Sequence, residues 1–157
     1  MTNLETSSSK PAAVSSWLVL AFFILAAIGF VDATYLAVEY FLGTPVSCSI
    51  LKGCEEVTTS HYSKFFGQPV ALFGSIYYLT VILLTAIYFE TKKRLFFTFA
   101  NILTLLGFLI SMRFVYLQVF VIKAICIYCM ASATSSTLLF ALSIFSFKKP
   151  KSNPQIS

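Results

Sequence analysis

Residues 69–89 read PVALFGSIYYLTVILLTAIYF and contain no charged side chain. A helix needs about 20 consecutive apolar residues to cross the hydrocarbon core of a bilayer. Three further stretches meet this length, at Trp17–Leu42, Leu95–Ile122 and about Ile125–Phe147. None alternates with the period of two that marks the strands of a small barrel. We therefore expect an all-α membrane protein, a bundle of four transmembrane helices that satisfies its backbone in lipid.

The composition agrees with a membrane protein. Of the 157 residues, 58% are hydrophobic and 11% are charged, whereas soluble domains are about half apolar and a quarter charged. The net charge of +5 comes from basic residues that lie between and after the apolar stretches. Membrane topology explains this pattern better than nucleic-acid binding does.

The basic residues also predict orientation. The two tails and the link between the second and third spans contain seven basic residues: Lys10, Lys92, Lys93, Arg94, Lys148, Lys149 and Lys151. The other two connections contain only three: Lys52, Lys64 and Lys123. The positive-inside rule then gives a multi-pass protein of the cell membrane with both termini in the cytoplasm. We expect residues 1–16 to form a disordered tail and residues 148–157 a basic one.

Four spans place all four cysteines on the outer side. Cys48 and Cys54 lie in the loop between the first two spans, and Cys126 and Cys129 lie where the fourth span begins. The outer compartment is also the one in which disulfides persist. The two pairs are therefore expected to share one surface, although they are far apart in the sequence.

The segment Cys126-Ile127-Tyr128-Cys129 is a CxxC motif at a predicted helix start. Residues three apart lie on the same helical face, and a helix N-terminus stabilises a thiolate. This favours a reactive, reversible disulfide. The alternative is a pair of inert buried thiols, because free cysteines are often buried.

The second pair, Cys48 and Cys54, is separated by five residues, of which Gly53 gives the loop flexibility. The pair is either a structural staple or a mobile redox pair, and a zinc site would need shorter spacings or histidines. Two redox pairs on one face indicate a relay by thiol–disulfide exchange. Such a relay needs a membrane-soluble acceptor, and a quinone is the obvious one.

Three stretches carry a family resemblance. They are GFVDATYL at 29–36, the loop and second span from Cys54-Glu55-Glu56-Val57 through FGQPVALFG at 66–74 to Tyr77-Tyr78, and YLQ at 116–118 with CIYCMASA at 126–133. Together with the order and spacing of the cysteines, they resemble bacterial vitamin K epoxide reductase homologues. The resemblance covers nearly the whole hydrophobic region.

The resemblance implies a four-helix bundle around a quinone, ubiquinone or menaquinone. It makes Cys126 and Cys129 the active-site pair, with Cys129 nearer the quinone. It makes Cys48 and Cys54 the shuttle pair, with Cys54 attacking Cys126 and Cys48 exchanging with an outside partner. It also places Ser60 in a short interfacial helix over the mouth of the bundle. The implied quinone contacts are Ser60, Val70, Phe73 and Ala133.

Two departures refine this expectation. Animal members of the family have an Asn near Val70 and a Tyr near Ala133, at the quinone head. Because this chain has neither, the resemblance favours a bacterial-type quinone reductase over an epoxide reductase. Many bacterial homologues carry a fused thioredoxin-like domain, but this chain ends about ten residues after its last predicted helix. We therefore expect a separate thioredoxin-fold (DsbA-like) protein outside the cytoplasm as the electron donor.

The sequence thus predicts a quinone-linked thiol oxidoreductase that reoxidises this partner and drives disulfide formation in exported proteins. The alternatives are a non-enzymatic membrane protein with two structural disulfides, a DsbB-like oxidase of unrelated sequence, and a metal-binding or transport protein. Two local features carry expectations of their own. Glu55–Phe66 is interpreted either as a short amphipathic segment that caps the pocket or as an ordinary interfacial loop. Asp32, inside the first span, is interpreted as the partner in an interhelical hydrogen bond rather than as a proton relay.

Overall fold

The computed structural model describes residues 16–44, 46 and 53–148. The predicted tails lie outside the described residues, apart from Ser16, which begins the first long helix, and Lys148, which ends the last one. The long helices are α1 (Ser16–Leu42), α3 (Val70–Thr91), α4 (Arg94–Tyr116) with its π-helical continuation η2 (Leu117–Ile122), and α5 (Ile127–Lys148). The short elements are α2 (Cys54–Thr59), the 3-10 turn η1 (His61–Ser63), β1 (Lys64–Phe65) and β2 (Gln68–Pro69).

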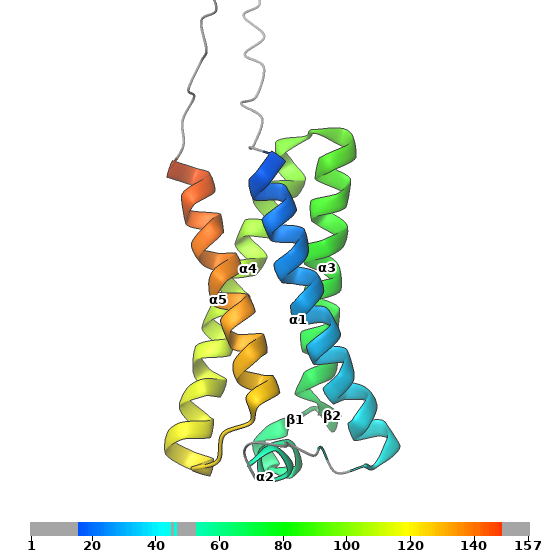
Figure 1. The fold of residues 1–157 in the computed structure, drawn as a ribbon, viewed down its shortest axis with the longest axis vertical. Helices are drawn as coiled ribbons and strands as arrows, with labels where there is room; N and C mark the ends of the chain where they lie inside the picture. The colour runs from blue at the N-terminus through cyan, green and yellow to red at the C-terminus, as the bar shows by residue number, and fades with distance from the viewer. Residues whose placement is uncertain (1–15, 45, 47–52, 149–157) are drawn as a thin grey trace, which may run out of the picture.

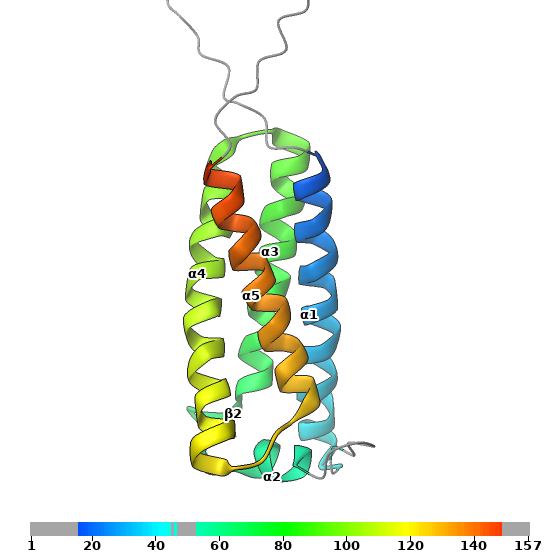
Figure 2. The same ribbon diagram turned by 60° about the vertical axis from the view of Figure 1, so that its left-hand side comes forward.

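The four long helices form an up-and-down bundle, which confirms the predicted fold class (Figure 1). In this bundle α1 packs against α3 and α5, and α4 packs against the same two helices. The start of α1, the end of α5 and the turn between α3 and α4 lie at one end (Figures 1 and 2). Helix α2 and the β1–β2 hairpin lie across the opposite end.

All four helices are long and apolar enough to cross a membrane. Their outward faces carry exposed apolar side chains such as Leu20, Leu83 and Leu109. In water such a surface would be costly, but in a bilayer it faces lipid tails of the same polarity. The protein is therefore a multi-pass membrane protein, as its composition predicts.

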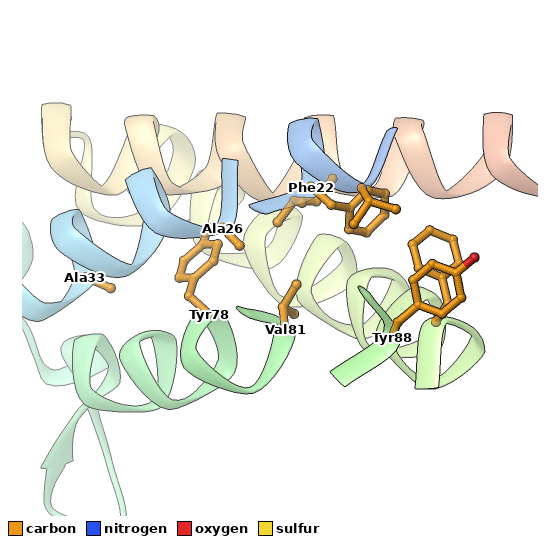
Figure 3. Close-up of a cluster of buried hydrophobic side chains, with 9 residues drawn as sticks. Phe22, Ala26, Ala33, Tyr78, Val81 and Tyr88 are labelled. Carbon is orange, nitrogen blue, oxygen red and sulfur yellow. The ribbon is translucent and has the colours of Figure 1, made fainter. Parts of the chain in front are cut away.

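The bundle core depends on close helix approach. Phe22 and Ala26 of α1 pack with Tyr78 and Val81 of α3 in one buried cluster (Figure 3). A Cβ built on Gly29 would lie 2.3 Å from the Tyr78 ring. Glycine at this position therefore gives the ring room to lie between α1 and α3, as small residues do at membrane helix interfaces.

The loop between α1 and α3 differs from the amphipathic segment considered for Glu55–Phe66. Only Cys54–Thr59 is α-helical, and the chain then forms a small antiparallel hairpin in which Phe65 pairs with Gln68. The two turn residues, Phe66 and Gly67, have φ values of 51° and 79°. Positive φ at both positions is the geometry of a tight two-residue hairpin turn, for which glycine is well suited.

The fourth long helix begins at Ile127, two residues later than the expected Ile125. Lys123 adopts a left-handed conformation with φ 58°, and its N–H and that of Ala124 both donate to the carbonyl of Gln118. These two bonds to one carbonyl close the end of η2, with a left-handed residue just after the helix as at many helix ends. The chain then needs residues 123–126 to reverse direction before α5 can start.

Candidate redox site

The two cysteine segments meet at the hairpin end of the bundle. Cys54 begins α2 and Cys126 immediately precedes α5, and both belong to one buried cluster, which also contains Leu36, Val57 and Ala124. Their side chains are 1% and 0% exposed. The convergence expected from four spans is therefore seen for these two residues, whereas Cys48 lies outside the described part of the chain.

Gly53 sets how closely the two segments approach. Its φ of −90° is open to any residue, so glycine is not required there by backbone conformation. However, a Cβ at this position would lie 2.8 Å from both the backbone nitrogen and the backbone oxygen of Ile125. The backbone before Cys54 thus rests directly on the backbone before Cys126.

The cysteines differ in state. Cys54 is disulfide-bonded, whereas Cys126 and Cys129 are free thiols. The Cys126 carbonyl accepts the first helical bond, from the N–H of Met130 at 3.0 Å. Cys126 is therefore the N-cap of α5, and its side chain faces the unpaired amides of the first turn.

This position makes Cys126 acidic. The hydrogen bond from the Cys129 thiol is the largest influence, and with the amides of Cys129 and Tyr128 it lowers the pKa of Cys126 to about 7, against the opposing effect of burial. Near neutral pH a large fraction of Cys126 is therefore thiolate, which is the nucleophilic form. A helix N-cap and a neighbouring thiol supply the activation that the CxxC motif predicts.

Gln118 holds the turn that carries Cys126. Its side-chain oxygen accepts the Cys126 N–H at 3.0 Å, and its backbone oxygen accepts the Ala124 N–H at 3.1 Å. The side chain is 1% exposed. One residue of the π-helical segment thus fixes both ends of the short link to α5, in keeping with the frequent occurrence of π-turns at functional sites.

A cavity of about 360 Å³ opens beside the CxxC motif. It lies between the four long helices and α2 and is lined mainly by apolar and aromatic side chains. Cys129 lines it, and Cys126 does not. All four residues implied as quinone contacts are in its wall: Ser60, Val70, Phe73 and Ala133.

A family model described as the vitamin K epoxide reductase family matches residues 20–144. The chain belongs to the vitamin K epoxide reductase family. The match spans all four long helices and both described cysteine segments. Among curated proteins, no significant match to the chain is found.

Two residues of this vitamin K epoxide reductase family site have roles that the sequence did not reveal. Gly53 makes a close backbone contact, whereas its place in the loop indicated only flexibility. Gln118 holds the turn, and the resemblance implied no role for it. A polar residue eight positions before a CxxC cysteine, at the end of an apolar span, is the signal that could have found it. Both residues act through contacts with a distant segment.

The expectation for Asp32 was wrong in part. No described residue forms a hydrogen bond to its buried Oδ2 atom, so the predicted interhelical bond is not made there. Its carboxyl group is nevertheless close enough to act electrostatically on the Cys126 thiol. The first helix of this family member therefore places an acidic group near the redox pair.

Proposed function

We propose that this protein is a quinone-dependent thiol oxidoreductase that reoxidises a separate thioredoxin-fold protein outside the cytoplasm and so drives disulfide formation in exported proteins. Family membership supports membrane oxidoreductase chemistry. The observation that carries the proposal is the order of groups at the site. Cys54 shares a buried cluster with Cys126, and Cys129 lines the cavity. This order gives electrons a continuous route from the loop to the cavity.

The cavity suits a quinone head. Its volume lies within the range of about 300–1,000 Å³ typical of small-molecule sites, and its apolar wall suits a flat, uncharged ring. Val70, Phe73 and Ala133 would hold the faces of the ring, and Ser60 lies near the capping helix α2. When bound there, a quinone accepts two electrons and two protons as the Cys126–Cys129 dithiol closes to a disulfide.

The proposed thiol steps combine the cluster shared by Cys54 and Cys126 with the cysteine roles that the family resemblance implies. Reduction of the Cys48–Cys54 disulfide by the partner dithiol leaves the partner oxidised and both loop cysteines as thiols. The Cys54 thiolate then attacks Sγ of Cys126 in the Cys126–Cys129 disulfide, and Cys129 leaves as thiolate. Attack of Cys48 on Cys54 re-forms the loop disulfide and releases Cys126 as thiolate. Two electrons have then moved to the CxxC pair, and the thiolates take up two protons.

The proposed orientation rests on charge. Lys92 and Lys93 lie at the end of the bundle opposite α2, and basic residues favour the cytoplasmic side. The termini would then face the cytoplasm and the cysteines the outside. Labelling of intact cells with a membrane-impermeant thiol reagent after reduction tests this orientation, because labelling of either pair from the cytoplasmic side alone would contradict it.

The deciding experiment uses purified protein with a reduced thioredoxin-fold oxidase and a soluble quinone analogue. We expect wild type to reoxidise the partner with stoichiometric quinone reduction, and Cys129→Ser to do neither. A Cys48→Ala variant should accumulate a mixed disulfide between Cys54 and Cys126, whereas a Cys48→Ala, Cys126→Ala variant should not. Undiminished partner oxidation by Cys129→Ser would rule out the relay and leave two structural disulfides as the better interpretation.

A further inference from the structure

The carboxamide of Gln118 has two ends with different surroundings. One end faces the Cys126 N–H at 3.0 Å. Because an N–H only donates, the atom that faces it must be the carboxamide oxygen. The amino end is therefore directed elsewhere, and the same side chain forms part of the cavity wall. No described residue accepts a hydrogen bond from this NH₂ group. Its nitrogen is also not one of the fully buried polar atoms that lack a partner among the described residues.

Several hydroxyls in the cavity wall already donate elsewhere. Thr58 donates to the carbonyl of Cys54 at 2.8 Å, and Ser60 donates to that of Val57 at 2.8 Å. Tyr78 donates to the Ser132 carbonyl at 2.6 Å. Tyr77 also lines the cavity, but its hydroxyl oxygen is buried and has no accessible surface there. These hydroxyls are thus already engaged, whereas the Gln118 NH₂ group remains available to a ligand in the same wall.

We propose that Gln118 donates a hydrogen bond from its NH₂ group to a carbonyl oxygen of the quinone, while its oxygen holds the Cys126 amide. This inference rests on the proposed function and assigns a binding residue to the same site. The planar carboxamide of Gln118 then binds both the quinone carbonyl and the turn that carries the CxxC motif. The ligand carbonyl is held next to the sulfur that must deliver the electrons, Cys129. Val70 and Ala133, apolar residues in the same wall, have no side-chain donor for this purpose.

Two substitutions separate the two ends of the amide. Gln118→Glu keeps an oxygen for the Cys126 N–H, so the turn is retained; because burial favours the neutral acid, the variant is measured at a pH high enough to ionise the carboxyl group, which then has no hydrogen to donate. Gln118→Met removes both functions. The control is Asn101→Leu, which removes another buried carboxamide of α4 that is not in the cavity wall. Its Oδ1 is unpaired among the described residues.

The readouts do not require turnover. With the Cys126–Cys129 pair oxidised, binding of a short-chain ubiquinone analogue is measured by ligand-dependent thermal stabilisation. The carbonyl stretch of the bound analogue is measured by infrared difference spectroscopy. We expect Gln118→Glu and Gln118→Met to bind roughly tenfold more weakly, the loss of about one hydrogen bond. Both should also move the carbonyl stretch back toward its unbonded frequency, and Asn101→Leu should change neither.

Two failures are distinguishable. If wild type does not bind the analogue, the proposed function fails, and this inference fails with it. If wild type binds while Gln118→Glu retains both its affinity and its carbonyl frequency, the assignment of Gln118 is overturned and the thiol relay stands. Should Gln118→Met fail to fold, Gln118→Glu decides the question alone, because its acceptor oxygen preserves the turn.

Discussion

Replacement of Gly53 by alanine tests how closely the two cysteine segments must approach. The added Cβ would lie 2.8 Å from the nitrogen and from the oxygen of Ile125, and 3.2 Å from the Cβ of Ala124. An ordinary contact begins at 3.4 Å. Two of these three atoms belong to the backbone, so no side chain can rotate out of the way. The α2 segment and the turn before α5 must therefore separate by about 0.6 Å.

This displacement has two consequences. Forcing an extra methyl group into a packed interface costs about 1–3 kcal/mol of folding free energy. It also moves the Cys54 sulfur relative to Cys126, and a misplacement of about 1 Å can slow a positioned reaction about a hundredfold. A separation of about 0.6 Å therefore predicts a roughly tenfold slower attack of Cys54 on Cys126.

The assay follows formation of the Cys54–Cys126 mixed disulfide in a Cys48→Ala background, by acid quenching and mass spectrometry of unreduced peptides. Gly43→Ala is the matched control. Gly43 has φ +65°, and a methyl group added there would meet nothing within 4 Å, so alanine costs about 1–2 kcal/mol through backbone strain alone. Both variants should lose similar stability, and only Gly53→Ala should slow the exchange. Equal exchange rates in the two variants would refute the close contact as the determinant of transfer.

Two further predictions concern the thiol and the helix interface. The Cys129 thiol is the main cause of the lowered pKa of Cys126, so Cys129→Ala should shift the pH profile of Cys126 alkylation upward from about 7. Cys129→Ser keeps a hydrogen-bond donor and should shift the profile less. Identical profiles in the wild type and Cys129→Ala would contradict this cause. Gly29→Ala should cost about 1–3 kcal/mol in a reversible detergent unfolding assay, because its Cβ would lie 2.3 Å from the Tyr78 ring. Gly74→Ala, which makes an ordinary 3.4 Å contact, should be neutral or slightly stabilising, and equal losses would argue against the packing shown.

The fold followed from the sequence because lipid imposes a length and a composition on each span. An even number of spans then brought residue 54 and residue 126 to one end without any knowledge of packing. Neither rule reaches the finer contacts. The approach of Gly53 to Ile125 and the bond from Cys126 to Gln118 join segments with no periodic pattern between them. The hairpin at residues 64–69 was missed because its turn geometry depends on two residues, while the apolar residues around it also fit an amphipathic helix.

In the proposed relay, thiol exchange has two different controls. The first half of the exchange, attack by Cys54, depends on how closely the two cysteine segments approach, and Gly53 allows that close approach. The second half, release of Cys126 when the mixed disulfide resolves, depends on the leaving group, since a thiol of lower pKa leaves faster. The N-cap position and the Cys129 thiol supply that low pKa. Gly53→Ala should therefore slow formation of the mixed disulfide and leave the pH profile of Cys126 alkylation unchanged. Cys129→Ala removes the disulfide that Cys54 attacks, so its effect is measured on the Cys126 thiol alone, which should become a poorer leaving group.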